Sequence, residues 1–271
     1  MTESLDLDAF NAFEESGWEG AAGDYSSYLA AVTAEFAEPL LDAAGVTAGT
    51  DVVDVATGPG VVAGAASRRG AKVFGVDISE SMVRLAAERQ PECEFVRGDA
   101  ESLPFRDGSY DAAVCGFGLL HVGRPERAAA ELARILRPGG RVALTVWNVP
   151  ARSRLHGVVL EAIAEIGAKP PDDVPAGPPL FHFADDAEFA ALLEGAGFGD
   201  VRISVVEHDH VPPSADALWE GILGGAVRLR RTVVDQGPDV QARIRAAFDR
   251  RLADEGGAVR VSAKLAAGVR A

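Results

Sequence analysis

A strand-like segment that leads into a glycine turn is the part of this chain best suited to binding chemistry. The stretch DVVDVATGPGVVAG, residues 51–64, begins as an apolar run, turns at Gly58 and Gly60, and continues as a helical pattern. Glycines let a ligand approach the backbone closely, and the free amides at the start of a helix attract an anion. The sequence therefore predicts a nucleotide-like ligand with an anionic group at this turn.

Two kinds of ligand fit the turn. Gly58, Gly60 and Ala63 match G-x-G-x-x-A, a pattern that dinucleotide sites share loosely with S-adenosylmethionine sites. The anion would be the pyrophosphate of a dinucleotide or the carboxylate of a methionyl group. Asp77 ends the next apolar run, 23 residues after Asp54, and can accept both ribose hydroxyls of either ligand. These residues do not distinguish a dinucleotide from S-adenosylmethionine.

Short, nearly continuous apolar runs alternate with helical patterns along the chain. Such runs are typical of strands that are covered on both faces, as in a parallel sheet. Right-handed crossovers between them give a doubly wound α/β fold. We expect strands at residues 51–56, 71–76, 93–96, 111–116 and 141–147, and two more at 200–211 and 258–269. The prediction is an α/β protein with a mostly parallel, seven-stranded sheet.

Segments outside this sheet are expected to cover its ligand. Open α/β sheets bind ligands at the carboxyl ends of their strands, so the additional helical or proline-rich segments are interpreted as a lid. Within one compact unit we expect an N-terminal helical cap at 1–45, a cofactor-binding core at 46–149, a lid insertion at 150–184, and a part at 185–271 that completes the sheet and adds a helical substrate cap.

The composition favours a cytoplasmic enzyme. The formal net charge of −15 opposes a nucleic-acid partner, and the compact basic cluster RLRR at 228–231 is interpreted as a solvated helix face. No apolar run approaches the ~20 residues needed to cross a bilayer, and the first residues lack the pattern of a signal peptide. Cys93 and Cys115 are expected to be inert packing residues. We expect a monomer or homodimer with no nucleic-acid or membrane partner.

The residues beyond the glycine turn carry a resemblance that separates the two ligands. The run FVRGDAESLPFRDGSYDAAV places Asp99 just after the third strand, ahead of a short LPF turn, and LRPGG precedes the fifth strand. From about residue 40 to 147 the chain resembles class I S-adenosylmethionine-dependent methyltransferases, especially the small-molecule group (methyltransferase type 11) that includes ubiquinone- and menaquinone-type enzymes. The resemblance implies S-adenosylmethionine as the cofactor and methyl transfer to a small organic acceptor, such as one from bacterial secondary metabolism.

The resemblance also implies a set of cofactor-binding residues. Those around the methionyl end are Ala56, Thr57, Gly58, Gly60, Cys115 and Gly116. Those around the adenosine are Asp77 at the ribose, Ile78 on the adenine face, and Asp99 and Ala100 at the adenine amino group; Tyr25 closes over the cofactor, and Met82 belongs to the same set. Ala56 stands where the family usually has a glycine, which costs little unless its backbone is left-handed. Pro59 removes an amide from the turn.

Methyl transfer needs a base only if the nucleophile of the acceptor must lose a proton. The candidate catalytic residues are His121, just past the fourth strand, and His182, in the lid. His208 and His210 share a strand face but have no third partner in the sequence, so no metal site is expected. His156 is expected to be a surface or cap residue.

Aromatic residues could line a pocket for the acceptor. The candidates are Trp18, Tyr25, Trp147 and Trp219. For Trp147 and Trp219 ordinary packing is the favoured interpretation, whereas the resemblance places Tyr25 at the cofactor.

Two other functions stay open at this point. A nicotinamide-dependent oxidoreductase would explain the glycine turn and Asp77, but it leaves Asp99 without a role, and the chain has no recognisable Tyr-x-x-x-Lys pair. A protein that binds the cofactor without methylating, for instance to cyclise a substrate, would use the same scaffold, because a fold does not fix its chemistry.

Overall fold

The computed structural model describes residues 5–271 and shows one mixed seven-stranded sheet. The strand order is β3-β2-β1-β4-β5-β7-β6, in which β1 to β5 pair in parallel and β7 pairs antiparallel with both β5 and β6. The strands are β1 (Asp51–Val55), β2 (Lys72–Asp77), β3 (Glu94–Arg97), β4 (Tyr110–Gly116), β5 (Leu136–Trp147), β6 (Phe198–His210) and β7 (Val259–Arg270). The predicted α/β sheet is confirmed. β5 starts earlier than the apolar run because Leu136 also pairs with Tyr110 of β4, and the register shifts between this pair and the next, Arg141 with Ala112.

Both faces of the parallel strands are buried, which explains their unbroken apolar runs. Val52 and Val114 pack on one face under α3 (Ala37–Ala43) and α4 (Val61–Arg68). Val53 and Ala113 pack on the other face, in a core that includes α6 (Pro125–Ile135) and α8 (Asp186–Gly195). Because strand side chains alternate between faces, a single strand needs apolar residues at every position to serve both layers.

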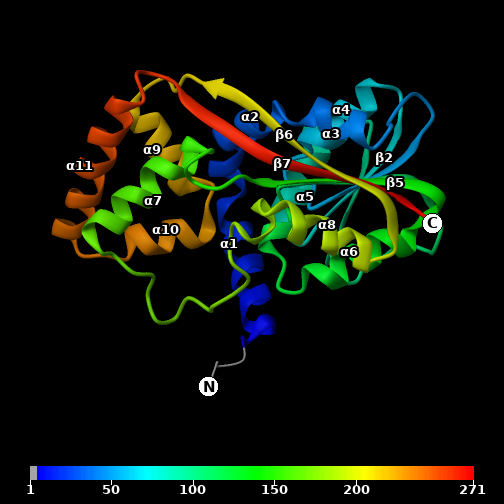
Figure 1. Cartoon of the computed structure of the whole chain (residues 1–271), viewed down its shortest axis with the longest axis horizontal. Coiled ribbons are helices and arrows are strands. Elements are labelled where there is room, and N and C mark those ends of the chain that lie inside the picture. The colour runs from blue at the N-terminus through cyan, green and yellow to red at the C-terminus, as the bar shows by residue number, and fades with distance from the viewer. Residues whose placement is uncertain (1–4) are drawn as a thin grey trace.

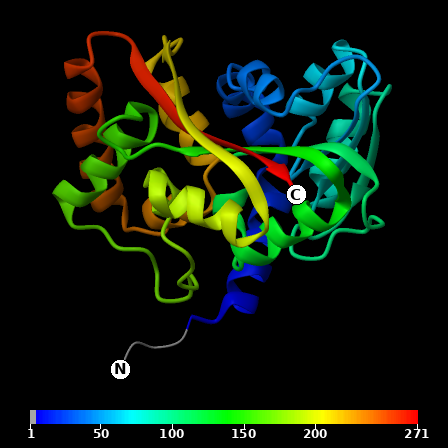
Figure 2. The same ribbon diagram turned by 45° about the vertical axis from the view of Figure 1, so that its right-hand side comes forward.

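Helices beyond the strand ends form a second group. Figures 1 and 2 show α7 (Arg154–Ile166), α9 (Ala215–Gly224), α10 (Val227–Val234) and α11 (Pro238–Asp254) gathered on the side toward which the parallel strands point. α1 (Leu7–Ser27) runs between this group and the sheet, in contact with α9 and α10 on one side and α5 (Glu80–Arg89) on the other. The short α2 (Leu29–Ala34) links α1 to α3.

The last two strands join the helical group to the sheet. β6 and β7 are 13 and 12 residues long, and β7 follows α11 directly and packs on α7. Two single-turn helices, η1 (Leu119–His121) and η2 (His182–Ala184), complete the described elements. Among residues 5–271, no helix combines the length and the apolar character required to span a membrane.

Candidate active site

A pocket at the carboxyl ends of the parallel strands brings most of the predicted site residues together. The predicted residues that line it are Tyr25, Ala56, Thr57, Gly58, Asp77, Ile78, Met82, Asp99, Ala100, Gly116 and His121. Gly60, Cys115 and His182 are not part of its lining. α1, η1, α7 and the segment leading into α10 also contribute side chains, so the pocket lies under the predicted covers.

The glycine turn after β1 has a left-handed backbone at three positions. Ala56 and Gly58 have φ of 54°, and Gly60, which precedes α4, has φ of 80°. A β-carbon on Gly60 would lie 3.2 Å from that of Ala86 in α5, whereas one on Gly58 would meet no atom within 4 Å. Gly58 therefore borders open space in the pocket. Ala56 accepts a strain of about 1–2 kcal/mol that a glycine would avoid, so its replacement of the usual glycine is costly.

Asp77, at the end of β2, is fixed by two backbone amides, one from the loop after β1 and one from the loop after β2. Its Oδ2 accepts a hydrogen bond from the Gly58 amide (2.8 Å) and its Oδ1 accepts one from the Ser79 amide (3.0 Å). Burial raises the pKa of Asp77, and the two amides oppose that rise. A carboxylate has about four acceptor sites, so each oxygen of Asp77 can still accept from a ligand hydroxyl.

Asp54 in β1 is a site residue for which the sequence analysis gave no role. Its side chain is almost completely buried, at 1% exposure, and lines the pocket. Its Oδ2 accepts from Thr57 Oγ1 (2.7 Å) and from the Ala63 amide (3.0 Å), while its Oδ1 has no partner among residues 5–271. Burial raises its pKa to about 7. An unpaired, buried acidic oxygen is well suited to a cationic ligand group such as an ammonium.

The adenosine side of the predicted site is covered by α1. Glu19 accepts hydrogen bonds from the hydroxyls of Ser79 and Ser81 and from the Ser81 amide, which lowers the pKa of Glu19 to about 2. Glu15, which lies one helical turn before Glu19 on α1, pairs with Arg97 at the end of β3. These bonds hold α1 over the loops that follow β2 and β3, where Asp77 and Asp99 lie.

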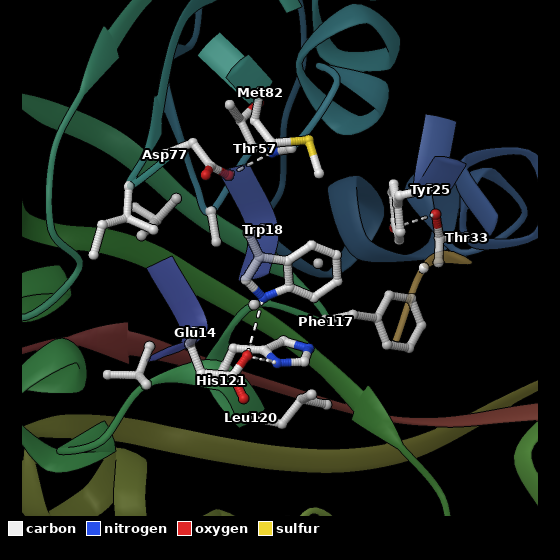
Figure 3. A pocket seen from close by; sticks show the side chains of 18 of the residues that line it. Glu14, Trp18, Tyr25, Thr33, Thr57, Asp77, Met82, Phe117, Leu120 and His121 are labelled. Carbon is white, nitrogen blue, oxygen red and sulfur yellow. Dashed lines mark hydrogen bonds and ion pairs between the residues drawn. The ribbon is translucent and has the colours of Figure 1, made fainter. Parts of the chain in front are cut away.

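Glu14 of α1 is the centre of a buried polar cluster on the opposite side of the pocket. Its side chain is 2% exposed, and its Oε2 accepts from Trp18 Nε1 (3.1 Å) and from His121 Nδ1 (2.9 Å). Its Oε1 pairs with Arg228 Nε at 3.0 Å. Figure 3 shows Trp18 between this cluster and Asp77, with the free ring edge of His121 directed toward the space beside Phe117.

Arg230 of the RLRR segment is exposed, as expected of a solvated face, but Arg228 departs from that expectation. The guanidinium also donates to the Leu120 carbonyl (2.8 Å) and to the Pro178 carbonyl (3.2 Å), so it joins α10 to η1 and to the 150–184 segment. Its burial lowers its pKa, and Glu14 opposes that effect. The side chain turns inward because a buried carboxylate needs a cationic partner.

Aromatic rings line the part of the pocket beyond His121. Phe117 stacks on Trp147 with ring centroids 3.9 Å apart, and Phe36 meets both edge-on. Trp147 therefore lines the pocket in addition to packing, whereas Trp219 packs on Phe248 and is outside the lining. Phe117 has φ of 61°, a conformation that costs a bulky residue about 1–3 kcal/mol and is found mainly at functional sites.

Three further histidines and Tyr25 have defined places. His156, expected to be a surface or cap residue, lies on α7 in the helical group; it is 5% exposed and packs on Trp147, so it is not at the surface. His182 is partly exposed in η2, 3.6 Å from Glu188, and the structure does not bring it to the pocket. His210 Nε2 forms a hydrogen bond with the Tyr28 hydroxyl (2.7 Å). The Tyr25 hydroxyl forms a hydrogen bond with Thr33 Oγ1 (3.0 Å), and burial raises the pKa of Tyr25 to about 12.

Comparison with known proteins identifies relatives of this chain. Residues 53–144 match the model of a methyltransferase domain family. A demethylmenaquinone methyltransferase of Beutenbergia cavernae is 34% identical over 172 residues, which are 59% of this chain and 70% of that relative. Another, of Renibacterium salmoninarum, is 36% identical over 122 residues, which are 45% of this chain and only 52% of that relative.

Solved structures share the fold. The YcgJ protein of Bacillus subtilis has a TM-score of 0.58 and 19% identity, covering 86% of this chain and 97% of its own. At this identity the likeness concerns the sheet and its helices alone. The relatives establish the family of this chain. Because they are methyltransferases, they overturn the oxidoreductase alternative. The chain belongs to the class I S-adenosylmethionine-dependent methyltransferases that act on small molecules, with S-adenosylmethionine as its cofactor.

Proposed function

We propose that this enzyme methylates a small planar acceptor whose hydroxyl group loses its proton to His121. The observation that carries the proposal is the bond between buried Glu14 and His121 Nδ1 at the edge of an aromatic pocket. When bound, the sulfonium of S-adenosylmethionine supplies an activated methyl group. The protein must hold the two reactants in line, exclude water and accept a proton.

Residues of the pocket fit the cofactor. The unpartnered Oδ1 of Asp54 would accept from the methionyl ammonium group, and the open space at Gly58 admits the methionyl end against the turn. Asp77 would accept from the ribose hydroxyls. Asp99 and Ile78, which line the same pocket, would contact the adenine. Gly60 acts indirectly, because it lets α4 start close to α5.

Glu14 fixes His121 in the tautomer that a base requires. A carboxylate accepts hydrogen bonds and cannot donate them, so the hydrogen in the Glu14–His121 bond is on Nδ1. Nε2 then carries the free lone pair and can take a proton from an acceptor hydroxyl. As that proton moves to Nε2, the electron pair of the O–H bond stays on the acceptor and increases its nucleophilicity. Arg228 Nε pairs with Oε1 of Glu14, the oxygen that does not contact His121.

An aromatic, oxygen-bearing acceptor suits the walls of this pocket. Phe36, Phe117 and Trp147 offer flat apolar surfaces, which favour a ring over a flexible or charged substrate. The relatives from Beutenbergia cavernae and Renibacterium salmoninarum are named for a quinone-type acceptor, demethylmenaquinone. We therefore propose that the acceptor of this enzyme is a phenol or a quinol.

Ligand-induced stabilisation tests the cofactor assignment. Binding to the native state alone stabilises it by about 2.7 kcal/mol when the ligand is at 100 times its Kd. S-adenosylmethionine and S-adenosylhomocysteine should each raise the Tm by about 5–10 °C in a thermal unfolding scan, and NADH should leave it unchanged. A shift with NADH alone would contradict the site.

Transfer of a labelled methyl group tests the reaction itself. The enzyme is incubated with methyl-labelled cofactor and a panel of demethylmenaquinol and simple naphthols, and labelled product is extracted into solvent. Turnover on at least one phenolic compound is expected. Tight cofactor binding without label in any product would instead favour the alternative in which the scaffold holds the cofactor for another reaction.

Asp54 makes both stability and cofactor binding depend on pH. Its pKa in the folded protein, about 7, is above the ordinary value of 3.8. Its contribution to stability is therefore complete below pH 4 and is lost as the pH rises through 7. Asp54→Asn, which keeps acceptors for Thr57 and Ala63, should stabilise the ligand-free protein at pH 8 by about 1–3 kcal/mol in urea unfolding.

The same variant should bind S-adenosylhomocysteine about tenfold more weakly at pH 8, because the ammonium loses a charged partner. Calorimetric titrations at pH 6 and pH 8 measure this difference. Asp111→Asn, an acid at the start of β4 that is outside the pocket lining, is the control and should leave cofactor binding unchanged. Equal pH dependence of Asp54→Asn and the wild type would show that Asp54 does not face the ammonium.

A further inference from the structure

The inner end of the pocket combines an aromatic wall with one unsatisfied polar side chain. Phe117 and Trp147 form a stacked pair, and the ring of His156 is tilted against Trp147 with centroids 4.7 Å apart. These three residues come from the end of β4, the end of β5 and α7, and all line the pocket. We call them the ring-binding end.

His156 is placed where an apolar residue would serve packing equally well. It lies on the buried face of α7 with Leu155, Val158 and Val159, and its Nδ1 has no hydrogen-bond partner among the described residues. Burial lowers the pKa of His156 to about 4, so the imidazole is neutral near pH 7. A neutral imidazole still needs one donor and one acceptor partner. A ligand in the pocket is the available source of such a partner.

The backbone holds this histidine in place. A β-carbon on the next residue, Gly157, would lie 2.3 Å from the Pro150 carbonyl oxygen, so α7 sits directly against the loop that follows β5. Ser153, which precedes the helix, is fully buried beside β7. The backbone of α7 at His156 is thus held against the loop after β5, and the ring of His156 packs on Trp147.

The strained conformation of Phe117 supports a function for this wall. Its left-handed φ is retained although glycines stand on both sides of it, at 116 and 118. Strain of this kind persists where it positions a side chain for function. Here it turns the ring onto Trp147, and the two together present a flat surface next to His121 and His156.

We propose that the ring-binding end holds the aromatic ring of the methyl acceptor and that His156 hydrogen-bonds a second oxygen on that ring, away from the oxygen that faces His121. This inference rests on the proposed methyl transfer and adds the selectivity of the site. His156 is then a specificity-determining residue that distinguishes dioxygenated rings from rings with a single hydroxyl group. The two histidines approach the pocket from different elements, η1 and α7.

Binding of naphthols to the protein saturated with S-adenosylhomocysteine tests the proposal. The probes are 2-naphthol and the 1,4-, 1,5-, 2,6- and 2,7-isomers of dihydroxynaphthalene, titrated under nitrogen and followed by calorimetry. At least one isomer should bind about tenfold more tightly than 2-naphthol to the wild type. His156→Phe should abolish this preference while its affinity for 2-naphthol and for S-adenosylhomocysteine stays within threefold.

Two other variants make the result specific. His156→Gln, which keeps a donor and an acceptor, should restore part of the preference and shows that a folding defect is not the cause. His182→Phe, the same change at a histidine outside the pocket, should behave as the wild type. A preference that survives in His156→Phe, or no preference in the wild type, overturns the inference. Failure of S-adenosylhomocysteine binding or of methyl transfer would instead overturn the proposed function.

Discussion

Asp77→Ala should weaken the binding of S-adenosylhomocysteine by about 100-fold or more. The carboxylate is expected to accept both ribose hydroxyls, and each hydrogen bond to a charged group contributes about 1.5–3 kcal/mol. The substitution also frees the Gly58 and Ser79 amides that Asp77 holds in place. Calorimetric titration gives the affinity, and the thermal shift produced by the cofactor should disappear.

Asp107→Ala provides the comparison for this loss. Asp107 is an exposed acid that pairs with Arg134 far from the pocket lining, so its removal should leave the cofactor affinity unchanged. Circular dichroism establishes that both variants keep the wild-type fold. Full affinity in a folded Asp77→Ala protein would show that the cofactor does not lie at the end of β2.

His121→Ala should lower kcat by about 10²–10⁴-fold, the usual contribution of a general base. The KM for the acceptor should change much less, because the ring is held mainly by Phe117 and Trp147. Glu14→Gln should lower kcat by a smaller factor, since His121 stays in place but loses its fixed tautomer and Arg228 loses its ion pair. Steady-state kinetics on a phenolic acceptor separate kcat from KM.

The control for His121 is the second histidine that the sequence singled out. His182→Ala alters a partly exposed side chain in η2 that pairs with Glu188 and does not line the pocket. It should keep kcat within threefold of the wild type. If His121→Ala also stays within threefold, proton transfer to His121 is not part of the reaction, and its bond to Glu14 is purely structural.

Features that depend on local periodicity were predictable from the sequence. An apolar run, a glycine turn and a helical pattern define a β-α unit, so the turn at Gly58 and the acidic residues Asp77 and Asp99 could be placed at one edge of the sheet. The same reasoning located β6 and β7 within two residues at each end. Parallel strands make this possible because their carboxyl ends meet at a common edge.

Residues of the covering helices were not predictable, because their neighbours come from distant parts of the chain. Glu14, Arg228 and His156 lie on α1, α10 and α7, and which face of each helix is buried depends on how the helices cross. From the sequence alone, a charged residue beside apolar ones is predicted to be exposed to solvent unless its ion-pair partner is known. One local signal was present: Glu14 and Trp18 are four residues apart, on the same face of α1.

The position of α1 has a consequence for the order in which the enzyme assembles. This helix is synthesised first, yet Glu14 can be neutralised only after His121 and Arg228 have been translated, more than a hundred and more than two hundred residues later. Before that, α1 can dock through the side that contacts α5 and through Glu15 and Glu19, whose partners lie at residues 79–97. The helix that covers the pocket therefore completes its packing last, although it belongs to the earliest part of the polypeptide.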